Sequence, residues 1–128
     1  MELNQVTLPC TDYDESVHFY REMGFRQIVA SPPNYARFEC ECGATFSLHK
    51  VESVVAPSDI VVYFEVEDLD SVVQHLLDAG IVFESKPTDQ RWLWREAYLR
   101  DPTGNMLCIY HAGENRRFPP WRLIEGAV

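Results

Sequence analysis

The sequence predicts an α+β protein built from two βαβββ modules whose mixed sheets curl around a cavity. Two stretches repeat one pattern, TLPCTDYDESVHFYREMGF and YFEVEDLDSVVQHLLDAGI. When Gly24 is laid on Gly80, Asp14 falls on Asp70, and each stretch has the order strand, acidic cap, helix and glycine stop. Such self-similarity is the mark of an internal duplication, which decides the architecture before any single residue does.

A second pair of segments, ECGATFSL and PTGNMLCI, aligns Gly43 with Gly104 and extends the duplication to the strands that follow each helix. The second module carries a short insertion before this segment. A chain of 128 residues suits one domain with its own core. We expect one domain over 1–128, with a first module at about 1–50, a linker at 51–59, a second module at about 60–111 and a C-terminal tail at 112–128.

The first module should begin with a strand at about 3–10, because its residues alternate between an apolar and a polar face. Asp12 and Glu15 have the spacing of a capping box and Gly24 is a helix stop, so a helix is expected at 13–23. The remaining elements of this module are strands at about 25–30, 35–39 and 44–49.

The second module should begin with a nearly continuous apolar strand at 61–66. From Leu69 onward, apolar residues follow the i, i+3, i+4, i+7 spacing of an amphipathic helix, which Gly80 ends. A strand is expected next, at 81–85, followed by the loop KPTDQRWLW. The module closes with a hairpin turned by DPTG, whose strands are expected at 96–100 and 105–111.

The composition narrows the class of partner. Eleven Lys and Arg against 20 Asp and Glu give a formal net charge of −9, which repels phosphate backbones and anionic lipid. We therefore expect no nucleic-acid partner and no membrane contact. The start of the chain lacks the pattern of a secretory signal, so a cytoplasmic location is expected. The four cysteines have neither a disulfide-framework nor a zinc-knuckle spacing, and reduced thiols are expected.

The residues that alternate away from the helices are expected to line the cavity. They are Gln5, Thr7, Ser47 and His49 in the first module, and Val61, Tyr63, Glu65, Cys108 and Tyr110 in the second. Aromatic side chains are expected to wall a flat or apolar organic ligand, namely Tyr63, Tyr110, Trp92 and Trp94. A carboxylate or hydroxyl of that ligand would meet one arginine among Arg37, Arg91 and Arg95.

These features resemble the vicinal-oxygen-chelate superfamily, which holds glyoxalase I, extradiol dioxygenases, fosfomycin-resistance proteins and bleomycin-resistance proteins. The resemblance covers about 3–111. It rests on the duplicated βαβββ order, the opening LPCTD, the helix ends REMGF and LDAGI, and YLRDPTGNMLCIYH, which is similar to the superfamily's closing hairpin. It implies the fold more strongly than an activity, because one fold hosts many functions.

The resemblance implies metal ligands on the first and last strands of each module, at the positions of Gln5, Ser47, Val61 and Cys108. Val61 has no donor atom, Ser47 is a poor ligand, and Cys108 stands where a carboxylate is usual. The pattern therefore argues against the superfamily's usual metal, and no cofactor is expected. If a metal does bind, the expected site is a displaced ligand set, Gln5, His49, Glu65 and Cys108.

Three functions stay open. The first, implied by the bleomycin-resistance proteins, is a metal-independent protein that binds a small molecule in a cavity formed by a homodimer. The second is an enzyme with the displaced ligand set, either a metal-dependent lyase or isomerase of glyoxalase type or an extradiol dioxygenase. His49 and Glu65 are its candidate catalytic groups, with His49 as a general base. The third is a purely structural dimer. The tail, GENRRFPPWRLI, is expected to fold over a neighbouring surface.

Overall fold

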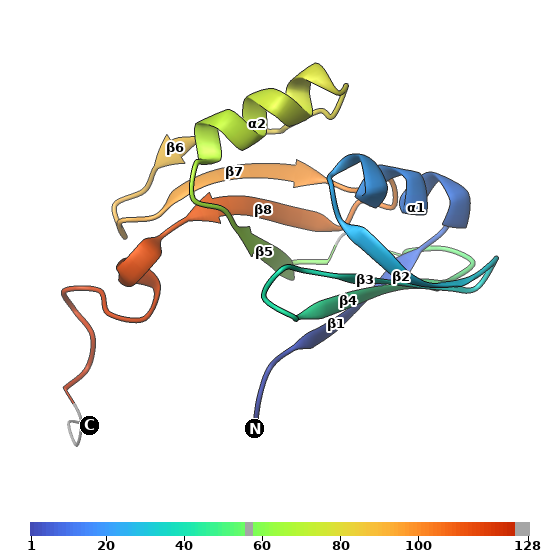
Figure 1. Ribbon diagram of the computed structural model, residues 1–128, viewed down its shortest axis with the longest axis horizontal. Coiled ribbons are helices and arrows are strands. Elements are labelled where there is room, and N and C mark those ends of the chain that lie inside the picture. Colours follow the sequence, from blue (N-terminus) through green and yellow to red (C-terminus); the bar gives the residue numbers. More distant parts are fainter. Residues whose placement is uncertain (56–57, 125–128) are drawn as a thin grey trace.

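The computed structural model describes residues 1–55 and 58–124, and it shows the duplicated order of elements (Figure 1). The first module comprises β1 (Gln5–Cys10), α1 (Tyr13–Glu22), β2 (Arg26–Ser31), β3 (Tyr35–Glu39) and β4 (Thr45–Lys50). The second comprises β5 (Val61–Glu65), α2 (Leu69–Asp78), β6 (Thr88–Asp89), β7 (Arg95–Arg100) and β8 (Met106–His111). A 3₁₀ helix, η1 (Gly113–Arg116), opens the tail.

Each module forms its own four-stranded mixed sheet. The first sheet has the strand order β1-β4-β3-β2 and the second has the order β5-β8-β7-β6. The first and last strands of each module pair in parallel, and the other neighbours are antiparallel. Among the described residues the two sheets stay separate and do not close into a barrel. The predicted α+β class and its paired modules are confirmed.

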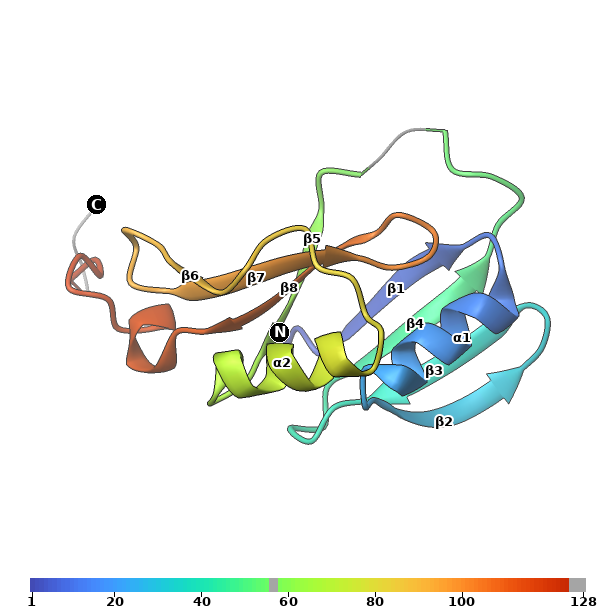
Figure 2. The ribbon, with the colours of Figure 1, turned by 90° about the horizontal axis from the view of Figure 1, so that it is seen from above.

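The two helices cover the same side of the molecule. Figure 1 shows α1 above the first sheet and α2 above the second, and Figure 2, seen from above, shows the two modules side by side. Each sheet therefore has one face packed under a helix and one open face turned away from the helices. Every residue that the alternation assigned to a cavity belongs to these open faces or to the loop beside them.

Local signals set the helix ends where the sequence predicts them. Asp12 and Asp68 each accept a hydrogen bond from the backbone N–H three residues later, at 3.0 and 3.1 Å. Gly24 and Gly80 follow the helices with φ of +98° and +93°, a conformation that a Cβ atom disfavours. In the described part of the chain, no helix has the length and apolar character that a membrane crossing requires.

The strand predicted at 81–85 is wrong, because the edge strand of the second sheet is the two-residue β6 further along. Val82 is 80% exposed, and the backbone N–H of Tyr98 on β7 donates to the Ser85 hydroxyl at 2.9 Å instead of to a strand carbonyl. Pro87 has no backbone N–H and therefore cannot donate a hydrogen bond to a neighbouring strand. Regular pairing therefore begins only after that proline.

The helix-covered faces of the two modules share one core. Phe64 of β5 packs against Phe25 and Phe46 of the first module, with ring centroids 4.7 and 5.4 Å apart. The hydroxyl of Tyr20 on α1 donates to Asp101, after β7, at 2.6 Å. Because burial of apolar surface drives association, this shared core holds the modules together.

The tail is anchored at its start and exposed beyond it. The indole of Trp94 donates to the carbonyl of Asn115 at 3.4 Å. Past η1 the chain runs away from the second module (Figure 1). Phe118 and Trp121 are each 56% exposed there. Within one chain, the described tail therefore does not fold over a neighbouring surface as the sequence predicts.

Candidate functional site

Gln5 and Ser47 meet on the open face of the first sheet. Their strands, β1 and β4, are parallel neighbours, and the Gln5 amide donates to the Ser47 hydroxyl at 2.8 Å. The hydroxyls of Tyr35 and Ser47 share a hydrogen bond of 2.6 Å, and Thr45 donates to the carbonyl of the Gln5 side chain. Ser47 is completely buried by these neighbours, although it lies on the open face.

Tyr35 connects this network to a cation. The Nε of Arg37, on the same strand β3, donates to the Tyr35 hydroxyl at 2.9 Å. The hydrogen bond with Ser47, followed by the hydrogen bond and the charge of Arg37, lowers the pKa of Tyr35. The sequence reasoning missed Tyr35. Its signal was the alternation of β3, which puts Tyr35 and Arg37 on one face.

His49 lies on this face but takes no part in the network. It is paired with Tyr35 across β3 and β4, and its side chain is exposed. No hydrogen bond or ion pair involves it in residues 1–55 and 58–124. The general base expected from the sequence is therefore available to solvent, without a group that would orient its imidazole.

Three of the four predicted aromatic residues form one cluster on the open face of the second sheet. Trp94 and Tyr110 stack with ring centroids 4.8 Å apart and planes at 25°. Tyr63 stands edge-on to both rings, at 5.8 and 5.4 Å. Tyr110 is buried, whereas Tyr63 is 42% exposed. These three residues, called the aromatic cluster below, present ring surface to solvent.

A buried carboxylate lies beside the aromatic cluster. Glu96 on β7 is 2% exposed and accepts hydrogen bonds from the indole of Trp92 at 3.2 Å and the hydroxyl of Tyr98 at 3.1 Å. Burial, followed by the charge of Glu96, raises the pKa of Cys108 to about 12. The Cys108 thiol is thus protonated at neutral pH and is a poor nucleophile.

Glu96 and Tyr98 were not predicted as site residues. Their signal was the register of the hairpin, because β7 and β8 pair Glu96 with Tyr110 and Tyr98 with Cys108. Residues paired across two strands point to the same face of a sheet. The sequence shows the alternation but does not show which neighbouring strand each residue faces.

Glu65 holds the start of the tail. Its carboxylate accepts hydrogen bonds from the backbone N–H groups of Ala112 and Gly113, at 2.7 and 2.9 Å. The guanidinium of Arg116 and the imidazole of His111 lie 3.8 and 3.9 Å away. These partners give Glu65 a structural role at the start of the tail, while its catalytic role stays a prediction.

The four ligand positions that the resemblance implies do not suit a divalent metal. Gln5 and Ser47 bond to each other, Val61 has no donor atom, and Cys108 is a buried, protonated thiol. Zinc takes thiolate, imidazole and carboxylate ligands, and harder cations take mostly oxygen. The donors present match neither preference.

The displaced ligand set is not gathered within one chain. Within the described residues, no group of three or more His, Cys, Asp and Glu side chains is placed to hold a metal ion. The set itself comprises Gln5, His49, Glu65 and Cys108, of which the first two lie on the first sheet and the last two on the second.

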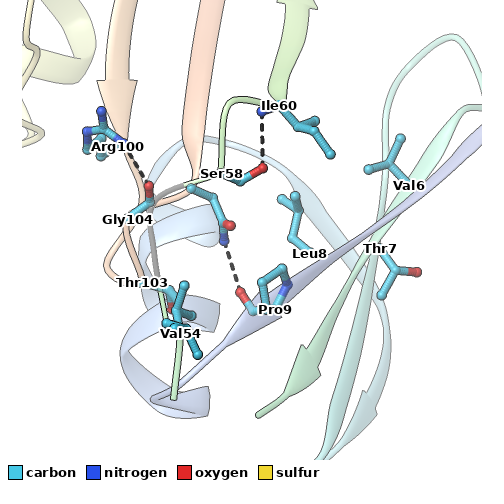
Figure 3. Close-up of a pocket in the computed structure, with 12 residues that line it drawn as sticks. Val6, Thr7, Leu8, Pro9, Val54, Ser58, Ile60, Arg100, Thr103 and Gly104 are labelled. Atoms are coloured by element: carbon cyan, nitrogen blue, oxygen red, sulfur yellow. Dashed lines mark hydrogen bonds between the residues drawn. The ribbon is translucent and has the colours of Figure 1, made fainter. Parts of the chain in front are cut away.

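The predicted cavity residues lie on two open faces, and Thr7 among them also lines a pocket between the two modules. A pocket of about 490 Å³ lies between β1, the connection that follows β4, and the turn between β7 and β8 (Figure 3). Its walls are largely apolar and include Val6, Leu8, Val54 and Ile60. The other predicted cavity residues and the predicted aromatic residues do not line this pocket.

The match to a family model covers both modules. Residues 2–109 match the model of the glyoxalase/bleomycin resistance protein/dioxygenase superfamily. A relative of comparable length is the uncharacterised protein YraH of Bacillus subtilis (strain 168), which is 31% identical over 127 residues covering 86% of this chain and 98% of YraH. The chain belongs to the glyoxalase/bleomycin resistance protein/dioxygenase superfamily.

Solved structures of this superfamily share the fold. A glyoxalase/bleomycin resistance protein/dioxygenase from Nocardioides superposes with a TM-score of 0.76 at 22% identity, covering 97% of this chain and 90% of that chain. A bleomycin-binding protein in complex with bleomycin superposes with a TM-score of 0.71 at 19% identity, covering 87% and 98%. At this identity the likeness concerns the fold alone.

Proposed function

We propose that this protein binds a small organic ligand against the aromatic cluster, without the superfamily's usual metal. The observation that carries the proposal is the exposed ring surface of Tyr63, set edge-on against the stacked Trp94 and Tyr110. Aromatic rings supply large apolar contact area at a low cost in conformational entropy. A cluster of this kind on an uncovered sheet face suits a flat or apolar organic molecule.

The donor chemistry supports binding without a metal. Val61 and Ser47 stand at two of the implied ligand positions, and neither is a ligand that zinc takes. Cys108 would first have to lose a proton from a thiol whose pKa is raised to about 12. Ligand contacts by the aromatic cluster need none of these groups.

A second copy of the chain is proposed to close the ligand cavity. Each chain presents two open faces, and both β1 and β5 are edge strands of their sheets. Covering such faces and edges is a usual reason for association. The bleomycin-binding protein with the same fold was solved in complex with bleomycin, which supports a small organic ligand for this chain.

Titration with bleomycin and with flat aromatic compounds tests this proposal, with tryptophan fluorescence as the readout because Trp94 belongs to the aromatic cluster. Tyr63→Ala should weaken binding about fivefold, since an aromatic contact contributes about 1 kcal/mol. Leu77→Ala is the matched control, because Leu77 is 45% exposed but lies on α2, on the helix side. Equal affinity of the Tyr63→Ala protein and the wild type would contradict the proposed site.

Metal content provides the second part of the test. Purified protein should contain substoichiometric metal, and treatment with a chelator should leave the ligand affinity unchanged. Stoichiometric metal that disappears in His49→Ala would instead favour a metal-dependent lyase, isomerase or dioxygenase with the displaced ligand set. The His49 side chain is exposed and makes no hydrogen bond or ion pair within the described chain, so its truncation should not disturb the fold.

A further inference from the structure

We propose that Arg37, on the open face of the first sheet, binds the carboxylate of a small organic acid. The proposal deepens the proposed function, on which it rests for the organic part of the ligand, by naming the acidic group. It concerns the other sheet, so its residues are separate from the aromatic cluster. Four side chains carry the argument, namely Gln5, Tyr35, Arg37 and Ser47.

Arg37 differs from the other arginines of the strands in having no acidic partner. Those partners are Glu39 for Arg26 at 3.6 Å, Asp70 and Asp89 for Arg95 at 2.9 and 3.1 Å, and Glu84 for Arg100 at 3.0 Å. No carboxylate of residues 1–55 and 58–124 forms a salt bridge with Arg37. In a chain with a net charge of −9, an arginine left without a carboxylate is available to an anion from outside.

The bond that Arg37 does make orients its free end. Its Nε donates to the Tyr35 hydroxyl at 2.9 Å, while its two terminal nitrogens make no recorded hydrogen bond within the described residues. A guanidinium has five N–H donors in a planar fork, and the fork matches the two oxygens of a carboxylate. Arg37 is half-buried, which reduces the screening of its charge by water.

The network behind Tyr35 holds this arrangement in place. Ser47 is completely buried and bonds to Tyr35 at 2.6 Å and to Gln5 at 2.8 Å, so the chain of contacts crosses three neighbouring strands. Side chains fixed by packing and hydrogen bonds lose little further entropy when a ligand binds. The hydrogen bond with Ser47 and then the one with Arg37 lower the pKa of Tyr35, as expected where both groups contact its hydroxyl.

One carboxylate lies close in sequence and does not compete. Glu39, two residues beyond Arg37 on the same face of β3, is engaged by Arg26 on β2. A matched control must leave this pair intact, and Arg21→Gln does so, because Arg21 lies on α1 and donates to Gln27 at 3.0 Å without touching Glu39 or the Tyr35 network.

The experiment compares benzoate with its neutral isostere benzamide, following the Nε–H signal of Arg37 by nuclear magnetic resonance. Wild-type protein should bind benzoate about tenfold more tightly than benzamide, which corresponds to one charge-assisted bidentate contact. Arg37→Gln should abolish this preference, and Arg37→Lys, which keeps the charge but loses the fork, should retain a small part of it. Arg21→Gln should leave the preference unchanged.

Three results would overturn the inference: absence of benzoate binding, equal affinity for benzoate and benzamide, or a preference that survives Arg37→Gln in a folded variant. The Tyr63→Ala variant separates this inference from the proposed function. If ligand binding depends on Tyr63 while the benzoate preference is missing, only the carboxylate site is wrong. If the preference depends on Arg37 while Tyr63→Ala has no effect, the aromatic site is wrong and the carboxylate site stands.

Discussion

Two tyrosines of α1 are both buried and differ in the partner of the hydroxyl group. Tyr20, fully buried, donates to Asp101 at 2.6 Å, and Asp101 also accepts backbone hydrogen bonds from Thr103 and Asn105. Tyr13 is 8% exposed, and its hydroxyl has no hydrogen-bond partner among the described residues. The Tyr20 hydroxyl therefore links the two modules, whereas the Tyr13 hydroxyl is buried without a hydrogen-bond partner in the described chain.

Removal of these hydroxyls should have opposite consequences for stability. Tyr20→Phe should lower the free energy of unfolding by about 1.5 kcal/mol, because it removes a hydrogen bond to a buried carboxylate, whose Oδ2 keeps only the donor from the Asn105 side chain. Tyr13→Phe should change it by less than about 0.5 kcal/mol or raise it, because the unpaired hydroxyl is already costly to bury. Denaturant unfolding of both variants measures the difference. Equal losses would contradict the assigned role of the Tyr20 hydroxyl.

At the level of single residues, the sequence predicted which side chains lie on the open faces but not what they contact. Alternation with period two is local, so it places Gln5, Ser47 and Tyr63 correctly. The bond from Gln5 to Ser47 depends on the parallel register of β1 and β4, whose paired residues are far apart in sequence.

The two ends of α2 show how much an N-cap hydrogen bond contributes to the stability of a helix. Asp68 accepts a hydrogen bond from the N–H of Ser71 at 3.1 Å, whereas Asp78, at the other end of α2, accepts one from the side chain of Gln74. Asp68→Ala should reduce the free energy of unfolding by about 1 kcal/mol through loss of the N-cap.

Asp78→Ala is the control for this prediction. A negative charge at a helix C-terminus opposes the helix dipole, so its removal should be neutral or stabilising by a few tenths of a kcal/mol. Thermal unfolding of both variants provides the comparison. A larger loss in Asp78→Ala than in Asp68→Ala would show that the cap does not define the start of α2.

Elements with strong local signals were predicted well, and the exception is the edge strand of the second sheet. Caps and glycine stops bound α1 and α2 within the chain itself. The segment 81–85 has the apolar character of a strand, but Ser85 takes the place of a backbone acceptor and Pro87 removes a donor. A hydrophobic pattern does not show where a side chain, such as the Ser85 hydroxyl, replaces a backbone carbonyl as the hydrogen-bond acceptor of a neighbouring strand.

For the whole molecule, the exposed apolar side chains argue for association. Leu123 and Ile124 of the tail are 78% and 80% exposed, and Phe118 and Trp121 are each 56% exposed. We expect a homodimer in solution, with twice the mass of one chain by light scattering. The double variant Phe118→Ser, Trp121→Ser should shift the equilibrium toward the monomer if the tail contributes to the interface. Val82→Ser, which changes an 80% exposed residue in the segment that follows α2, should not.

A wild-type protein that remains monomeric at high concentration would contradict the proposed dimer and leave both open faces to solvent.

The duplication in the sequence is sufficient to predict the fold class, because each module repeats a complete set of elements. The duplication does not determine which open face of one chain would contact which open face of a second copy. That contact depends on the surfaces of two folded chains and not on any local sequence pattern.

Each sheet is built entirely from strands of one half of the chain. The peptide between β4 and β5 thus acts as a tether, which keeps Phe64 beside Phe25 and Phe46 at the high effective concentration of an intramolecular contact. A cavity closed by a second copy has no such tether. Its ligand affinity should therefore fall when the protein is diluted below the dissociation constant of the dimer, even though every chain remains folded.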